Sequence, residues 1–361
     1  MELHRRLAFN GIQVWELDRD VVYEGLTHSA GDWVIPMDQE YAELVRTLFE
    51  IQDYPDIREY EGGPPMRPYD VSGWTLPYQF DVRVMEAASP LPAEVRAAMS
   101  PVRGEARDWR TTTEMGEGDD AAPFDTPPGL GFDSDTVAAG IVPSPGLIRG
   151  GGSALVLSPS QNNTFQALNR AWKAEASVRF EAASPREDYP DSGGRYFITG
   201  MGGADAETMV RELGLRAQRS GAGGNTVRRP RIGLFRPWQA SMDEGWTRWL
   251  LERYGFDLSS VRNIDVRNGH LRDRFDVLVL ASYGSRTILE GNAEGSIPPR
   301  FAGGIGEEGV RALDEFVRSG GTLVCMNASS DFAIDALALP VKNVVSEVGT
   351  SQFSVSGSIL E

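Results

Sequence analysis

Phe275-Asp276-Val277-Leu278-Val279-Leu280 is the stretch that decides the fold of this chain. A run of successive apolar residues, rather than alternate ones, indicates a short strand that is buried on both faces of a sheet. Comparable runs occur at residues 232–235 and 322–326, and an amphipathic helix is predicted over residues 307–319. Buried strands that alternate with helices are typical of a parallel, doubly wound α/β sheet.

Further elements are predicted in this last domain, residues 228–361. Ser241, followed three residues later by Glu244, has the pattern of a capping box, which predicts a helix that runs through Arg253. Residues 263–266 are predicted to form a second strand, and residues 352–360 a strand with no helix after it. We therefore expect the domain to be cut short at its C-terminal end.

A weak internal repeat organises the preceding part of the chain. Residues 3–48 and 168–213 each read as helix, strand, glycine-containing turn, apolar strand and helix. The second copy is preceded by Ala154–Leu157, whose apolar residues predict a buried strand, and the first copy has no counterpart. We expect the first copy to lack its leading strand and to have an open sheet edge, as the rear part of a longer polypeptide would.

The expected fold class is α/β, with repeated small α/β units followed by the doubly wound parallel sheet, incomplete at both ends. The first copy spans residues 1–50 and the second spans residues 151–220. Residues 51–150 read as a Pro- and Gly-rich connection with an acidic patch at residues 114–125 and at most one strand, at residues 80–85. The aromatic stretch within this connection, at residues 67–77, is expected to pack against the core.

The glycines at residues 221–224 are expected to form a flexible join before the last domain. Proteases should therefore cut first between Arg219 and Arg231 and within the acidic patch at residues 114–125.

The composition limits the classes of partner. The chain has 361 residues, of which 41% are hydrophobic, and a formal net charge of -17. An acidic chain lacks the basic face that nucleic acids or anionic membranes require, so neither partner is expected. No apolar stretch is long enough to span a membrane. Self-association through exposed sheet edges remains open, and the cellular location is not predicted.

Several blocks resemble a known family. Asp32-Trp33-Val34-Ile35-Pro36-Met37-Asp38-Gln39 resembles the region that follows the catalytic domain in large bacterial proteins of the M14 zinc carboxypeptidase family. The block at residues 237–249, Pro-Trp-Gln-Ala-Ser-Met-Asp-Glu-Gly-Trp-Thr-Arg-Trp, resembles the class I glutamine-amidotransferase-like domain that trails it. The resemblance implies a flavodoxin-like sheet and a non-catalytic accessory segment, with a zinc peptidase domain upstream on the same polypeptide as its partner.

No zinc site is expected within the chain itself. Zinc peptidases of this family use an HxxE pair and a distant histidine, but the residues three places after His4, His28 and His270 are Leu7, Gly31 and Asp273. His270 is predicted to be a surface histidine. The Gly304–Gly309 match to GxGxxG follows no strand and carries Glu307 and Glu308, so it is interpreted as the start of an acid-capped helix.

An amidotransferase-like domain would place its nucleophile at the sharp turn after a central strand, and here that turn falls on Asn327 or Ala328. Cys325, the one cysteine, lies inside the strand and is predicted to be structural with a raised thiol pKa. Catalysis through Cys325 remains a third alternative, and no catalytic residue is predicted.

The alternative to an accessory role is a binding module for a small polar, sugar-like ligand. Ligands in open α/β sheets bind beyond the carboxyl ends of the strands. The loops there carry polar or aromatic side chains that could bind such a ligand but that also serve as helix caps and turn formers. The candidate residues are Trp238, Ser241, Ser282, Asn327 and Ser330.

Overall fold

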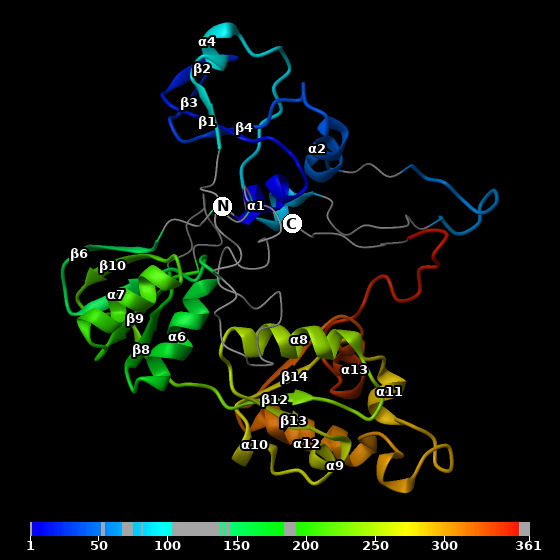
Figure 1. The fold of residues 1–361 in the computed structure, drawn as a ribbon. Helices are drawn as coiled ribbons and strands as arrows, with labels where there is room; N and C mark the ends of the chain where they lie inside the picture. The colour runs from blue at the N-terminus through cyan, green and yellow to red at the C-terminus, as the bar shows by residue number, and fades with distance from the viewer. Residues whose placement is uncertain are drawn as a thin grey trace. The chain divides into compact units, whose positions relative to one another are not determined.

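The computed structural model describes residues 2–51, 55–66, 75–80, 82–102, 138, 141, 145–183 and 193–353. The chain forms two compact units, residues 1–143 with 345–361 and residues 144–344 (Figure 1). Helices and strands are mixed in both, which confirms the α/β class. The acidic patch at residues 114–125 lies outside the described residues, as does almost all of the strand predicted at 352–360; Gln352 and Phe353 are not in a strand.

The first unit contains a three-stranded antiparallel sheet in the order β4-β1-β5. Its elements are α1 (Glu2–Phe9), β1 (Trp15–Leu17), β2 (Val21–Tyr23), β3 (Leu26–His28), β4 (Trp33–Val34), α2 (Ala42–Phe49), α3 (Leu76–Gln79), α4 (Ala93–Arg96) and β5 (Met99–Pro101). Helix α1 buries Leu3 and Leu7 against Val14, Val45 and Leu76. The β2–β3 hairpin was not anticipated, because the sequence there reads as an irregular turn.

The predicted connection at residues 51–150 takes more part in the fold than expected. Strand β5 pairs with β1, and β6 (Leu147–Gly150) belongs to the sheet of the second unit. The strand predicted at residues 80–85 is wrong for the described residues: Phe80 ends α3, and Val82 and Val84 are 38% and 47% exposed. Of the aromatic stretch at residues 67–77, residues 67–74 are outside the described part, and Leu76 is buried as expected.

The second unit begins with a six-stranded mixed sheet in the order β11-β8-β9-β7-β10-β6. Its further elements are β7 (Ala154–Leu157), α6 (Asn163–Lys173), β8 (Ser177–Glu181), β9 (Arg195–Thr199), α7 (Gly203–Glu212), β10 (Arg216–Ser220) and β11 (Asn225–Val227). The strand predicted at Ala154–Leu157 is confirmed, and all four of its residues are buried. Helices α6 and α7 cover a core that includes Leu155, Leu168, Ile198 and Val210.

The flexible join predicted at residues 221–224 is wrong. Strand β11 pairs with β8, so these glycines lie in a loop within the six-stranded sheet. Gly224 has φ +70, and a side chain there would meet the Phe180 carbonyl oxygen at 2.3 Å. The Arg179 side chain also donates to the Gly224 carbonyl oxygen, at 3.0 Å from Nε. The sheet therefore extends beyond the predicted range of 151–220, and the loop is held in place.

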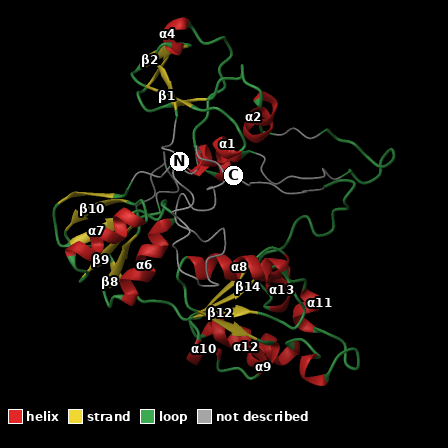
Figure 2. Ribbon diagram, in the orientation of Figure 1, coloured by secondary structure: helices red, strands yellow, loops and turns green. Residues whose placement is uncertain are grey.

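A four-stranded parallel sheet completes the second unit, in the order β13-β12-β14-β15. Its elements are β12 (Ile232–Phe235), α8 (Met242–Arg253), β13 (Leu258–Val261), α9 (Asn263–Arg267), α10 (Leu271–Arg274), β14 (Val277–Leu280), α11 (Ser285–Leu289), η2 (Pro299–Phe301), α12 (Gly306–Arg318), β15 (Thr322–Cys325) and α13 (Ala328–Ala336). Helix α8 lies on one face, and α9, α10 and α12 lie on the other (Figure 2). This is the doubly wound arrangement that the sequence predicts, but the buried strand predicted at residues 322–326 is wrong in its burial: β15 is at the edge of the sheet, and Val324 is 39% exposed.

One strand of this sheet lies at a different position from the one predicted. Residues 263–266 fall in helix α9, and the second strand is β13, which starts five residues before the predicted strand. The Asp265 carboxylate accepts a hydrogen bond from the Arg262 backbone N–H at 2.8 Å, which caps the helix. Ile264 is 51% exposed, so its apolar side chain is not a sign of a buried strand.

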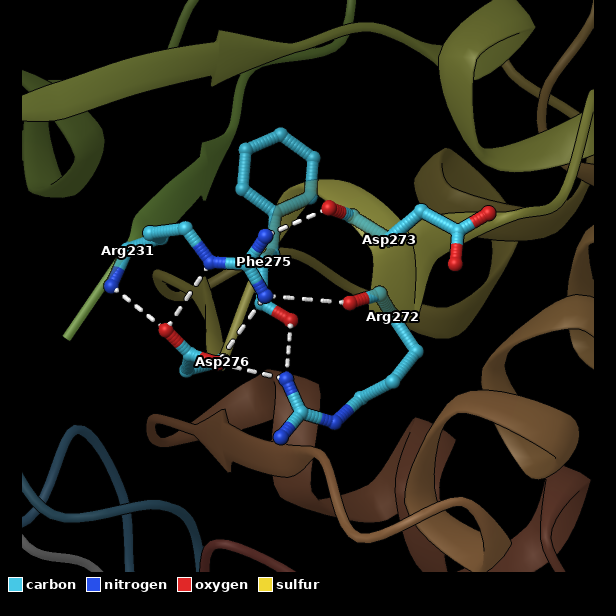
Figure 3. Close-up of polar contacts among 5 residues, drawn as sticks. All are labelled: Arg231, Arg272, Asp273, Phe275 and Asp276. Atoms are coloured by element: carbon cyan, nitrogen blue, oxygen red, sulfur yellow. Dashed lines mark hydrogen bonds and ion pairs between the residues drawn. The ribbon is translucent and has the colours of Figure 1, made fainter.

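An arginine–aspartate network holds the beginnings of β12 and β14 together (Figure 3). The Arg231 side chain donates to both Asp276 oxygens, at 3.1 Å from Nε and 3.0 Å from Nη2, and its backbone N–H donates at 2.9 Å. It also donates to the carbonyl oxygens of Arg272 and Asp273. Arg272 in turn donates to the Phe275 carbonyl oxygen at 3.0 Å. These groups lie at the end of the sheet opposite to the expected ligand site.

Candidate ligand site at the strand ends

The four parallel strands end at one edge of the sheet, and the strand order reverses between β12 and β14. In open α/β sheets this reversal creates the crevice where ligands bind. The five predicted residues follow three of these strands: Trp238 and Ser241 follow β12, Ser282 follows β14, and Asn327 and Ser330 follow β15. Four of them lie in the connections after the strands, and Ser330 lies in the first turn of α13.

Asn327 occupies a sharp turn between β15 and α13. It is the N-cap of α13 and has φ 47 and ψ -120, a backbone conformation that residues with a side chain rarely adopt. Such a conformation costs on the order of 1–3 kcal/mol and is found most often at functional sites. The Asn327 amide nitrogen donates to the Ser282 hydroxyl at 3.0 Å. The turn is where the sequence places a nucleophile elbow, but its side chain is a carboxamide.

Two serines near the turn have structural partners. Ser329 is fully buried; its hydroxyl accepts from the Tyr283 N–H at 3.0 Å and donates to the Ala281 carbonyl oxygen. The Ser330 hydroxyl donates to the Cys325 carbonyl oxygen at 3.1 Å. These bonds attach α13 to the ends of β14 and β15. Ser330 is therefore neither the helix cap nor the turn former that the sequence offered as its alternative role, and its hydroxyl instead ties the first turn of α13 to the end of β15.

An aromatic and cationic stack covers the ends of β12 and β13. The Arg262 guanidinium lies 4.0 Å from the centroid of the Trp238 ring, and the Phe301 ring lies 4.5 Å from that centroid. Arg262 also donates to the Arg236 carbonyl oxygen at 2.9 Å. Trp238 remains 42% exposed, so part of its ring is available to a ligand.

A buried carboxylate gathers arginines at the same edge. Glu244 is 6% exposed; Arg248 donates to it at 3.0 Å from Nε, and the Arg236 Nε lies 3.9 Å away. The Ser241 hydroxyl accepts from the Glu244 N–H at 3.3 Å, which confirms the serine cap of α8. Burial, followed by the charge of Arg236, lowers the pKa of Arg262. Arg236 and Arg248 thus lie beside the same buried carboxylate, and Arg248 also lies 3.5 Å from Glu252.

Tyr283 lies beneath this cluster with its hydroxyl buried. The residue is 5% exposed, and no described residue completes a hydrogen bond to its oxygen with good geometry. Burial, with a contribution from the Glu244 carboxylate, raises its pKa to about 12, while Ser241 and Arg236 act in the opposite direction. The phenol is thus neutral near pH 7, and its hydroxyl is a buried donor.

Arg262 and Glu244 are the residues of this site that sequence reasoning missed. Arg262 follows β13, and the sequence placed that strand at residues 263–266 instead, which hid the loop. Glu244 was interpreted as half of a capping box, but its carboxylate turns to the arginines. Had the strand been predicted at residues 258–261, Arg262 would have been the first residue after a strand end and so a candidate for the ligand site.

The first unit has a shallow cavity of about 240 Å³, lined by Gln13, Trp15, Pro36, Asp38, Gln39, Arg96 and Met99. The Gln39 amide is already bonded to both backbone groups of Gln13 and to the Pro36 carbonyl oxygen. Arg96 is paired with Asp38 at 3.1 Å. Because these polar groups have partners, the strand ends are the better candidate.

The histidines of the described residues do not form a metal site, and no group of three or more potential ligands occurs in that part of the chain. His270 lies at the surface, as predicted, with its side chain 86% exposed and 3.7 Å from Asp273. His4 is partly buried, and burial lowers its pKa to about 3. None of the described helices is long and apolar enough to cross a membrane.

Cys325 lies in β15 and packs against the core of the four-stranded sheet. Burial raises its thiol pKa to about 11, so the thiolate is scarce at neutral pH. We expect iodoacetamide at pH 7.5 to leave Cys325 unmodified in the native chain and to label it fully in urea, measured by mass spectrometry. Rapid labelling of the native chain would contradict a structural cysteine.

Comparisons with protein-family models, with curated proteins and with solved structures find no significant match to this chain. The structure therefore defines a class of fold: an α/β protein with a doubly wound parallel sheet, which has polar and aromatic side chains at its strand ends.

Proposed function

We propose that this chain is a non-catalytic accessory segment of an M14-like zinc carboxypeptidase, with any zinc held by a peptidase domain elsewhere on the same polypeptide. The family part of the proposal is supported by the sequence blocks at residues 32–39 and 237–249.

One observation carries the non-catalytic part. Asn327 occupies the turn where an amidotransferase-like domain would need a thiol, and it has the strained backbone of such a turn. A carboxamide is not a nucleophile, and the nearby Cys325 points into the core with a raised pKa. A turn that has the backbone of a nucleophile elbow but no nucleophilic side chain supports a binding or positioning role for this domain rather than catalysis.

The test is hydrolysis by the purified chain. With zinc added, peptides with free C-termini and free glutamine should both remain intact, and Asn327→Ala should behave as the wild type. Turnover that follows the chain through purification would contradict the proposal. Asn327→Cys provides a positive control for the turn: its thiol, at a helix N-terminus, should react with iodoacetamide at a pH where Cys325 does not.

A second candidate function is binding of a small polar ligand at the strand ends, and the arginine cluster favours it. The Arg236 side chain is 49% exposed, Arg262 lies on the partly exposed Trp238 ring, and the Tyr283 hydroxyl is buried. A cation beside an aromatic face suits a sugar that carries a carboxylate, because the ring stacks while the guanidinium pairs with the acid.

Thermal unfolding with added glucuronate or glucose tests this candidate. Glucuronate should raise the melting temperature more than glucose does, and Arg236→Gln and Trp238→Ala should remove the increase. Arg311→Gln is the matched control, since Arg311 is an exposed arginine on α12 that pairs loosely with Glu307. Equal stabilisation of all variants, or none with either sugar, would contradict binding at this site.

A further inference from the structure

The two copies of the internal repeat pair their strands in the same register. In the first copy Trp15 is opposite Val34, and in the second Arg179 is opposite Phe197. The third strand also matches: β5 pairs with β1 antiparallel, as β11 pairs with β8. The sheet β4-β1-β5 therefore corresponds, strand by strand, to β9-β8-β11.

The residues that pack against α1 in the first copy and against α6 in the second copy show which positions of the two copies correspond. Helix α1 packs on Val14, Ile35 and Val102 in the first unit. Helix α6 packs on Val178, Ile198 and Val227 in the second. With these residues superposed, Trp33 corresponds to Tyr196 and Val34 to Phe197.

Strand β9 has a neighbour that β4 lacks. On its other side β9 pairs antiparallel with β7, where Leu155 is opposite Ile198 and Leu157 is opposite Tyr196. Within the described part of the first unit, β4 is at the edge of its sheet. The exposure differs accordingly: Phe197 and Ile198 are each 2% exposed, whereas Val34 and Ile35 are only partly buried.

The backbone of β4 is arranged to accept a strand. The Leu17 N–H donates to the Asp32 carbonyl oxygen at 2.8 Å, so this pair of residues is a hydrogen-bonded one. Hydrogen-bonded pairs alternate in an antiparallel ladder, which directs the N–H and C=O groups of Val34 toward β1 and those of Trp33 and Ile35 away from it. The outer edge thus presents two donors and two acceptors beside partly exposed apolar side chains.

We propose that the β4 edge is a docking site for one extended strand with the chemistry of β7, which pairs antiparallel with residues 33–35 as β7 pairs with β9. The chemistry of β7 defines this occupant. Leu155 and Leu157 face the helix-covered core, and Ala154 and Val156 pack on the opposite face. The docked strand therefore carries apolar residues at successive positions, and its backbone supplies the pairing.

A synthetic peptide provides the test. It contains residues 153–158, Ser-Ala-Leu-Val-Leu-Ser, with lysines added at both ends for solubility and a fluorophore for anisotropy. We expect saturable binding to the full chain, and hydrogen exchange slowed at the Trp33 and Ile35 amides. N-methylation at Leu155 and Leu157 removes the N–H groups that face β4 and should weaken binding at least tenfold. N-methylation at Val156, whose N–H faces away, should weaken it much less.

An Ile35→Pro variant tests the protein side. Proline at an edge position removes only an outward N–H and is tolerated there, and circular dichroism verifies the fold. It should lose peptide binding. No binding by the wild type, equal effects of the two methylated peptides, or protection at β9 or β10 instead would overturn the proposal. A dimer with Trp33 and Ile35 already protected without peptide would also overturn it, because a second copy would then cover the edge.

Discussion

Replacing Phe316 by alanine should lower the free energy of unfolding of the second unit by about 3–5 kcal/mol. Phe316 is on α12, is 1% exposed, and lies in the main core of the four-stranded sheet. Its ring fits against Gly321, where a side chain would come within 2.5 Å of it. Truncation therefore removes apolar contacts and leaves a cavity that the strand and helix backbones cannot fill. Urea unfolding followed by tryptophan fluorescence measures the effect.

Val317 is the matched control for this prediction. It is the next residue on the same helix and is 41% exposed. Val317→Ala should change the free energy of unfolding by less than about 0.5 kcal/mol. Similar losses from both variants would mean that α12 does not face the sheet as described.

Asp276→Asn should destabilise the second unit by about 1–2 kcal/mol at neutral pH, given that the site is partly exposed. Hydrogen bonds from Arg231 hold the pKa of Asp276 far below its ordinary value of 3.8, with Arg272 adding to the effect. A carboxyl with a depressed pKa in the folded state stabilises that state above its unfolded pKa, and the contribution is lost as the pH falls toward the folded pKa. The difference between wild type and variant should therefore be constant near neutral pH and shrink below about pH 4.

Asp273→Asn is the control for this prediction, because it removes a nearby negative charge without removing a hydrogen bond to the Asp276 carboxylate. The Asp273 side chain is 80% exposed, and only its backbone carbonyl oxygen takes part in the network. The variant should unfold as the wild type does between pH 3 and pH 7, when measured by urea titration at each pH. If Asp273→Asn and Asp276→Asn lowered the free energy of unfolding with the same pH dependence, the hydrogen bonds from Arg231 to Asp276 could not be the cause of that dependence.

The sequence alone determined the elements whose signal is local. Residues 232–235 and 277–280 are short runs of successive apolar residues, which are typical of strands inside a sheet, and residues 307–319 have one apolar face for a helix. Ser241 sets the start of α8 by the same kind of short-range rule, since its hydroxyl accepts from an N–H three residues away. The strand ends, and so the loops of the candidate site, followed from these elements.

Tertiary structure decided the features that depend on distant partners. Residues 263–266 are apolar enough for a strand, yet they form α9 because β13 already occupies the sheet position beside β12. Strand β5 has no signal of its own and is a strand because β1 pairs with it. Arg236 and Glu244 follow β12, with Glu244 in helix α8, whereas Arg262 follows β13, and the parallel pairing of these two strands brings their charges together. Sequence patterns encode burial and local hydrogen bonds, whereas pairing and charge clusters depend on which segments the fold makes neighbours.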